Sequence, residues 1–316
     1  MPQKWEKPLH QKTPLIQSFS MGRHFNGRPV YLKMEAFQPT GSFKIRGLGY
    51  ACQQALQRGA RQFLSSTEGN AGYAVSYAGR QLGVPTTVVM AENIPPVMRE
   101  KIHDMGAHVI LYGKEWEEAH HHALQLQQEH NLKNPENMMA YIPPFDLEDI
   151  WQGHMSLVDE WDEAPEAVIV AVGGGGLLMG ILRGLIKRGW GHVPVYSAET
   201  RGSEALALSL KTGQHVHLKD VNSIAHSIAL KSVCARAFEE AHAYGVRPLV
   251  VTDNAAVAAT LSFAQDHNVI VEPACGAALA PIYGNDHALK NVKSVHVVVC
   301  GGLGTTFEDL QAWSGA

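Results

Sequence analysis

Residues 41–47, GSFKIRG, place a single lysine, Lys44, behind a glycine-led turn and at the start of a predicted helix. A strand predicted over residues 30–35 ends shortly before this stretch. Phe43 and Ile45 are apolar neighbours that would desolvate the lysine amine and favour its neutral, nucleophilic form. A surface lysine beside a helix start is the alternative, and the rest of the chain has to decide between the two.

The composition is that of an ordinary globular chain. It has 316 residues, 45% of them hydrophobic, and a formal net charge of −4 at pH 7. This length predicts two lobes, and the scattered Lys and Arg argue against nucleic acid as a partner. No stretch approaches the roughly 20 apolar residues of a membrane span, and the N-terminus is polar, so we expect neither secretion nor membrane anchoring.

The cysteines and histidines lack the spacing of metal ligands. Residues 120–122 are three consecutive histidines, and adjacent helical positions do not share a face, so we interpret them as a solvated helix surface. The cysteines are far apart and form no CxxC pair, which argues against a zinc site or a disulfide framework and predicts a reducing, cytoplasmic location. They are Cys52, Cys234, Cys275 and Cys300.

Predicted strands alternate with predicted helices, which indicates an α/β fold made of parallel βαβ units. Apolar strand-like runs cover residues 63–66, 84–90, 108–112, 167–172, 193–199, 248–251 and 295–299. The proline-rich YIPPFD at residues 141–146 interrupts this alternation. We therefore place a lobe boundary there, with a small lobe over residues 39–145 and a large lobe over residues 1–38 and 146–316.

Two junctions between a strand and a helix are suited to bind anions. Residues 67–72, TEGNAG, follow one predicted strand, and the four glycines of residues 173–176 follow another. Such junctions present free backbone N–H groups and the positive end of a helix dipole to a carboxylate or phosphate. Consecutive glycines also let the backbone approach a ligand closely. For the first loop a plain strand-to-helix turn is the alternative.

A nucleotide-binding Rossmann unit is the competing interpretation of the four glycines. Glu199 ends the next strand roughly 20 residues later, as such a unit would require. However, a motif window starting at Gly173 or Gly174 puts Leu178 or Met179 where the third small residue should be. A short monophosphate is therefore the better ligand than a dinucleotide.

A lysine nucleophile, a glycine phosphate cradle and a third loop of small polar groups are together what pyridoxal 5′-phosphate needs. In this order they resemble the fold-type-II (tryptophan synthase β-like) pyridoxal-phosphate enzymes, and within them the L-serine dehydratase (serine/threonine ammonia-lyase) family. The matching segments are GSFKIRG at 41–47, EGNAG at 68–72, YIPPFD at 141–146, VGGGGLLMG at 172–180, EPACGAA at 272–278 and CGG at 300–302. The resemblance implies two parallel-sheet α/β lobes with the cofactor between them, in a homodimer.

The resemblance also implies roles for single residues. Lys44 would form the Schiff base and move the Cα proton, and Phe43 would stack on the pyridine ring. Asn70 would donate to the cofactor 3′-oxygen, while Cys300 and Ala229 would lie at the ring. The phosphate would be held by Gly173, Gly174, Gly175, Gly176 and Leu177, the substrate carboxylate by Ser66, Thr67, Gly69, Asn70 and Ala71, and a monovalent cation such as K⁺ by Glu199 with carbonyls around Ser203 and Ala205.

The implied reaction is the deaminating dehydration of L-serine or L-threonine to pyruvate or 2-oxobutyrate plus ammonia. Cys300 bears on this choice, because a thiol is a weaker partner for the ring nitrogen than an aspartate would be. Less charge is then stabilised on the ring, which favours elimination over reactions that need a long-lived carbanion. A non-catalytic pyridoxal-phosphate binding protein is the alternative from another class.

Glu68 departs from the family pattern. The residue before Gly69 is small in many serine dehydratases, serine in serine racemases, and an aspartate base in diaminopropionate ammonia-lyase. A carboxylate there is a candidate second acid or base. The alternative function is therefore a lyase or racemase acting on a D-, 3-substituted or diamino acid, unless Glu68 turns to solvent and is idle. Ser227 and Ala229 are a second departure, and they alter the predicted shape of the ring pocket.

Overall fold

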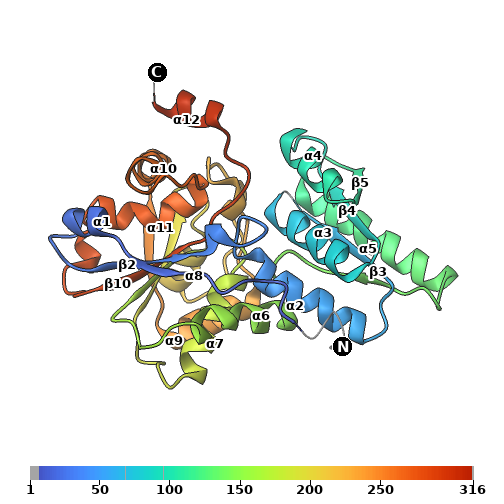
Figure 1. Cartoon of the computed structure of the whole chain (residues 1–316), viewed down its shortest axis with the longest axis horizontal. Helices are drawn as coiled ribbons and strands as arrows, with labels where there is room; N and C mark the ends of the chain where they lie inside the picture. The colour runs from blue at the N-terminus through green and yellow to red at the C-terminus, as the bar shows by residue number, and fades with distance from the viewer. Residues whose placement is uncertain (1–6, 68, 95, 315–316) are drawn as a thin grey trace. The chain divides into compact units, whose positions relative to one another are not determined.

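The computed structural model (Figure 1) describes residues 7–67, 69–94 and 96–314. Two compact units are present: residues 38–153 with residues 7–11 form the first, and residues 12–37 with residues 154–314 form the second. One of the crossings between the units, from Gly153 to His154, falls inside a continuous helix, α6 (Glu148–Asp159).

The first unit contains a four-stranded sheet of order β5-β4-β3-β6, in which every pair is parallel. Its strands are β3 (Gln62–Ser66), β4 (Thr86–Met90), β5 (His108–Leu111) and β6 (Met139–Tyr141). Its helices are α2 (Lys44–Gln57), α3 (Asn70–Leu82), α4 (Pro96–Asp104) and α5 (Trp116–Lys133).

Alternate residues of β4 face two different helix layers, because successive side chains of a strand point to opposite faces. Val88 lies near Gly72 of α3 and Ile102 of α4. Val89 belongs to a buried cluster with Ala119 and Ala123 of α5. The sheet is therefore covered on both faces, as parallel sheets require.

The second unit contains a six-stranded sheet of order β1-β2-β10-β7-β8-β9, parallel except for the antiparallel β1–β2 pair. Its strands are β1 (Leu15–Gln17), β2 (Val30–Met34), β7 (Val168–Ala171), β8 (Val195–Thr200), β9 (Arg247–Val251) and β10 (Val295–Val299). The helices are α1 (Phe19–His24), α7 (Gly176–Lys187), α8 (Ala205–Thr212), α9 (Ala235–Tyr244), α10 (Asp253–His267), α11 (Pro273–Tyr283) and α12 (Phe307–Ser314), with short 3-10 turns η1 (Glu35–Phe37), η2 (His226–Ile228) and η3 (His287–Leu289).

Helices cover both faces of this second sheet as well, with α10 and α11 on one side of the strands and α7 and α9 on the other (Figure 1). Helix α11 packs against four of the parallel strands, and four of its 11 residues are alanine. A Cβ at Gly276 would lie 2.1 Å from the Ala256 carbonyl oxygen of α10, so the two helices are in close contact. Small residues thus bring the central helix layer near the sheet.

The α/β fold with parallel strands, predicted from the alternation of strands and helices, is confirmed. The helix predicted to start at Lys44 is also confirmed, as α2. Two details differ: β1 is antiparallel, and the three-residue strand β6 forms where the proline-rich segment begins. Among the described residues, none of the helices is both long and apolar enough to cross a membrane.

Candidate active site

The residues predicted to bind ligands lie just beyond the carboxyl ends of parallel strands in each unit. In the first unit, β3 leads into residues 67–69 and then into α3. In the second, β7 leads into the four glycines, β10 leads into Cys300, and β8 carries Glu199 near its end. Strands β10, β7 and β8 are neighbours, so these groups share one edge of the sheet. The carboxyl edge is where open α/β sheets bind ligands.

Lys44 is the first residue of α2, and its side chain is held by the segment that follows β6. Its Nζ donates to the Pro144 carbonyl oxygen over 3.1 Å and lies 5.2 Å from the centre of the Phe43 ring. Two residues earlier, the Ser42 Oγ is buried and has no hydrogen-bond partner among the described residues. A buried hydroxyl of this kind needs a partner, which a bound ligand can supply.

The predicted substrate loop is shaped by the Thr67 side chain. Its Oγ1 accepts from the N–H groups of Gly69 over 3.1 Å and of Gly72 over 3.3 Å. Ser66 and Ala71 are buried on either side, and α3 begins at Asn70 without a side-chain cap at Gly69. A helix N-terminus of this kind carries the positive end of the helix dipole, which favours an anion. Glu68 lies outside the described residues.

The glycine loop of residues 173–176 is held by close packing of its backbone. A Cβ at Gly173 would lie 2.8 Å from the Ile228 Cα, and one at Gly175 would lie 2.6 Å from the Ala237 Cβ. Gly175 also has a φ of +93°, which disfavours every other residue type. The Gly174 carbonyl accepts from the Cys234 N–H over 3.0 Å. Helix α7 follows from Gly176 through Leu177, again without a side-chain cap.

Cys300 lies at the end of β10 among buried polar groups. The adjacent Cys275 thiol, with burial and the Glu272 carboxylate, raises the pKa of the Cys300 thiol, which therefore stays protonated. The Glu272 carboxylate accepts from Ser227 Oγ and, over 2.7 Å, from the Gly304 N–H. Ala229 directly follows Ile228, which contacts the glycine loop, so the segment before β9 lies beside the predicted phosphate site.

Glu199, predicted as a cation ligand, is buried, and both its oxygens accept backbone N–H groups. Leu206 and Ala207 donate to it over 2.8 Å each. Burial raises the pKa of Glu199 to about 7, against the lowering effect of these two donors. Ser203 precedes α8, and Ala205 is its first residue. Among the described residues, no group of three or more His, Cys, Asp or Glu side chains is arranged to hold a metal ion.

The chain is similar to known proteins along most of its length. A family model described as pyridoxal-phosphate dependent enzyme matches residues 7–301. This chain belongs to that family. It is 40% identical to a human protein named serine dehydratase-like, over 97% of this chain and 94% of the relative. It is 37% identical to an L-serine dehydratase of Dictyostelium discoideum, over 97% of this chain and 92% of the relative.

A solved structure of a fungal L-serine ammonia-lyase from Rhizomucor miehei has a similar fold. It superposes with a TM-score of 0.90 at 35% identity, covering 98% of this chain and 99% of that chain. The predicted family and fold class are thereby confirmed.

The residues present fit pyridoxal phosphate in each unit. The first unit provides an amine at Lys44 and an unpartnered buried hydroxyl at Ser42. The second provides a glycine loop in which Gly175 tolerates no Cβ, at the start of an uncapped helix. These are the amine and phosphate sites that members of a pyridoxal-phosphate family need.

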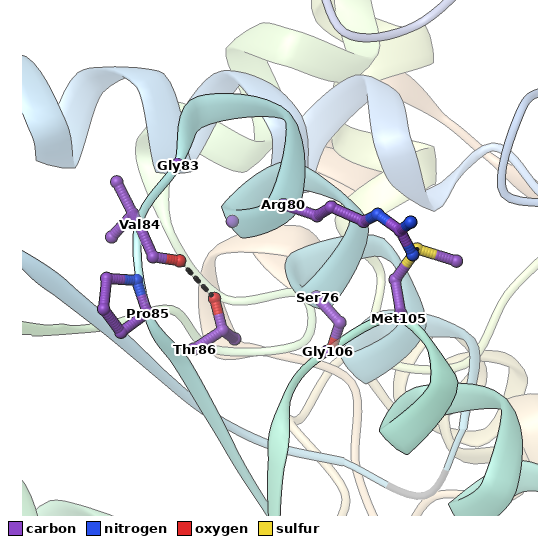
Figure 2. Close-up of a pocket in the computed structure, with 9 residues that line it drawn as sticks. Ser76, Arg80, Gly83, Val84, Pro85, Thr86, Met105 and Gly106 are labelled. Carbon is purple, nitrogen blue, oxygen red and sulfur yellow. Dashed lines mark hydrogen bonds between the residues drawn. The ribbon is translucent and has the colours of Figure 1, made fainter.

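A separate cavity of about 490 Å³ in the first unit lies away from these loops (Figure 2). Pro85 and Thr86, at the amino end of β4, form part of its lining, whereas the substrate loop follows the carboxyl end of the parallel strand β3. Arg80 extends along the cavity and donates to the Asp104 carbonyl oxygen over 3.3 Å. The cavity thus lies at the opposite edge of the sheet from the candidate site.

Sequence reasoning missed the side chains of α5 and β6 that surround Ser66. Trp116, His120 and Tyr141 all make contacts that lead to this residue. The histidines of residues 120–122 also differ from one another, since the His122 ring stacks on Tyr112 while His120 stacks on Trp116. The signal available in the sequence was the spacing of Trp116 and His120, which puts both on one helix face.

Proposed function

We propose that this chain is a pyridoxal-phosphate dependent ammonia-lyase that converts L-serine to pyruvate and L-threonine to 2-oxobutyrate, with release of ammonia. The observation that carries the proposal is the extent of the similarity. Proteins named serine dehydratase match along 97% of the chain. The matched length contains the lysine helix, the substrate loop, the glycine loop and the Cys300 strand end.

Bound pyridoxal phosphate supplies an electron sink for the charge that develops at the substrate Cα. Lys44 would carry the cofactor and then accept the Cα proton at its amine. The N–H groups at the start of α3, with Asn70, would orient the substrate through its carboxylate. Those of residues 173–177 would bind the phosphate. Loss of the β-hydroxyl as water would leave an enamine, whose imine tautomer takes up water to give the keto acid and ammonia.

The Cys300 thiol supports elimination as the favoured outcome. Its pKa is raised, so it stays neutral beside the buried Cys275 and Glu272. A neutral thiol neither gives the ring nitrogen a proton nor balances a positive charge there. The negative charge that develops at Cα is then only weakly stabilised. Departure of the β-hydroxyl removes this charge. An aspartate at this position would favour reactions with a longer-lived carbanion.

Two further assignments accompany this proposal. A monovalent cation such as K⁺ would bind near Glu199 and the carbonyls around Ser203 and Ala205, at the carboxyl end of β8. The chain would act as a cytoplasmic homodimer, as its resemblance to the serine dehydratase family implies. Assays in K⁺ and in tetramethylammonium buffers, together with sedimentation of the holoenzyme, test the cation and the dimer.

The direct test is a steady-state assay of the holoenzyme on L-serine and L-threonine, with keto-acid formation coupled to NADH oxidation. We expect Lys44→Ala to lower kcat by about 10³-fold, because it removes the acid–base group. The matched control is Lys133→Ala, on an exposed part of α5. Cofactor binding without keto-acid formation would instead favour the non-catalytic binding protein. Full activity in Lys44→Ala would remove the proposed role of this lysine.

A further inference from the structure

A chain of short hydrogen bonds connects the substrate loop to helix α5. Ser66 Oγ lies 2.6 Å from the Tyr141 hydroxyl oxygen, and that oxygen lies 2.6 Å from His120 Nδ1. Ser66 ends β3 and is fully buried, Tyr141 ends β6, and His120 is half-buried. The three residues come from three elements of the same unit.

Trp116 of the same helix contacts both ends of this hydrogen-bond chain. Its ring stacks on the His120 ring, with centres 5.0 Å apart and planes 15° apart, and its Nε1 donates to the Ser66 carbonyl oxygen over 3.3 Å. It also contacts the Phe145 ring at 5.9 Å. Phe145 adjoins Pro144, the residue whose carbonyl accepts from Lys44. One face of α5 therefore supports both the substrate loop and the segment that holds the lysine.

The direction of the hydrogen bonds depends on the protonation state of His120. When the imidazole is neutral with its proton on Nε2, Tyr141 donates to Nδ1 and Ser66 donates to Tyr141. The Ser66 proton is then directed to Tyr141, and toward any other group the Ser66 oxygen can only accept. When Nδ1 is also protonated, it donates to Tyr141, and Tyr141 donates to Ser66. The Ser66 proton must then turn away from Tyr141.

Burial and neighbouring groups shift the pKa values of His120 and Tyr141. Burial lowers the pKa of His120, His121 acts in the same sense, and Glu117 opposes them. Burial raises the pKa of Tyr141 to about 12, so the phenol keeps its proton in both states. The titratable groups that face the imidazole among the described residues are Tyr141 from β6, and His121 and Glu117 from its own helix.

We propose that Ser66, Tyr141 and His120 are positioning residues in which protonation of His120 reverses the hydrogen-bond chain and turns the Ser66 hydroxyl into a donor toward the substrate loop. A donor there strengthens binding of the substrate carboxylate, whereas a lone pair weakens it. In this reversal the proton gained by Nδ1 stays on the imidazole, and the two hydroxyls rotate without losing theirs. This inference rests on the proposed role of the loop in holding the substrate.

The inference is tested by the pH dependence of KM and kcat for L-serine in the holoenzyme. We expect KM to rise several-fold as the pH increases through the His120 transition, which burial moves below the ordinary range of a histidine pKa, while kcat does not follow the same transition. In Tyr141→Phe and in His120→Gln this transition in KM should disappear. The double variant should lose no more than either single variant, because all three disrupt one chain.

The matched control is His122→Gln, on the same helix but stacked on Tyr112. It should keep the wild-type profile. A KM transition that persists in both Tyr141→Phe and His120→Gln, or one that His122→Gln also removes, would overturn the inference. The use of two single variants keeps the test decisive if one of them folds poorly.

A second measurement does not depend on turnover. Nitrogen-15 NMR of histidine-labelled holoenzyme reports the protonation of each imidazole nitrogen, and His120→Gln identifies the His120 signals. Tyr141→Phe should shift the titration midpoint of His120, whereas His122→Gln should leave it in place. A His120 titration midpoint that Tyr141→Phe leaves unshifted would overturn the proposed hydrogen-bond chain. If the protein forms no keto acid but this shift is observed, the proposed function fails while the hydrogen-bond chain stands.

Discussion

The glycine loop and the substrate loop are both held in a fixed backbone conformation, but by different interactions. In the glycine loop, residues 173–176, the backbone is held by direct packing, with Gly173 against Ile228 and Gly175 against Ala237. In the substrate loop, residues 66–71, a hydroxyl group holds the backbone: Thr67 Oγ1 accepts from the N–H group of Gly69 and from that of Gly72, just after the loop. The glycine loop is fixed by close packing, which the absence of side chains allows. The substrate loop is fixed by hydrogen bonds to a side-chain hydroxyl.

This difference separates a rigid site from an adjustable one. Backbone packed against backbone or Cβ atoms has no proton to exchange and few alternative arrangements. A loop held through hydroxyls and an imidazole has alternative hydrogen-bond directions, which change with pH and with sequence. A rigid loop would suit the cofactor phosphate that we propose residues 173–176 bind, because that group is the same in every turnover. Amino-acid substrates differ, and the adjustable loop is where discrimination between them would occur.

Among variants of the two loops, the largest effect should come from placing a methyl group in the glycine loop. Gly175→Ala would put a Cβ 2.6 Å from the Ala237 Cβ and 2.7 Å from Val233 Cγ2, at a φ of +93°. Together the clash and the backbone strain should weaken cofactor binding on the order of 100-fold. Titration of the apoprotein with pyridoxal phosphate, followed by absorbance, measures this loss.

The control for Gly175→Ala is Gly189→Ala. Gly189 also has a positive φ, +74°, but its Cβ position has no described heavy atom within 4 Å. This substitution adds strain without a clash and lies outside the glycine loop, so cofactor affinity should stay within about 2-fold of wild type. Equal losses in the two variants would mean that strain dominates, and the account of close packing at Gly175 would be wrong.

A smaller effect is expected in the substrate loop from Thr67→Val. This substitution keeps the shape of the side chain but removes the acceptor for the N–H groups of Gly69 and Gly72. We expect KM for L-serine to rise by about 10-fold while cofactor affinity is unchanged, because a lost buried hydrogen bond costs about 1–3 kcal/mol. Thr67→Ser, which keeps the hydroxyl, should stay near wild type. If the valine and serine variants behave alike, the hydroxyl does not shape this loop.

The same contrast explains what could be predicted from the sequence. The sequence alone predicts the glycine loop, because four glycines after an apolar strand have few other uses. The support of the substrate loop was not, because it comes from side chains distant in the sequence. Ser66 and Tyr141 meet through the pairing of β3 with β6, and β6 is only three residues long. A strand of that length leaves too weak a pattern to be recognised.

The histidines of residues 120–122 illustrate the limit in another way. Periodicity correctly indicated that consecutive positions on a helix do not share a face. It could not indicate that the face carrying His120 turns toward Tyr141, because that depends on how α5 packs against β3 and β6. Residue patterns thus predicted the element and its period, while tertiary packing decided which face has a chemical role.

The smallest effect on L-serine turnover should come from Glu68→Ala, although this variant best distinguishes the two loops. Residues 173–176 are all glycine, whereas the substrate loop carries Glu68, which lies outside the described residues. If Glu68 acts as a second acid or base, its removal should lower activity on D-serine or diaminopropionate by about 10-fold or more, because general acid–base groups contribute at least that much. Activity on L-serine, which needs Lys44, should change by less than about 3-fold, since no step assigned to Lys44 requires Glu68. Parallel keto-acid assays on the three substrates measure both effects, with Glu68→Gln as the isosteric control. Unchanged activity on all three would leave Glu68 a solvent-facing side chain, and the adjustable character of the loop would then rest on Thr67 and Ser66.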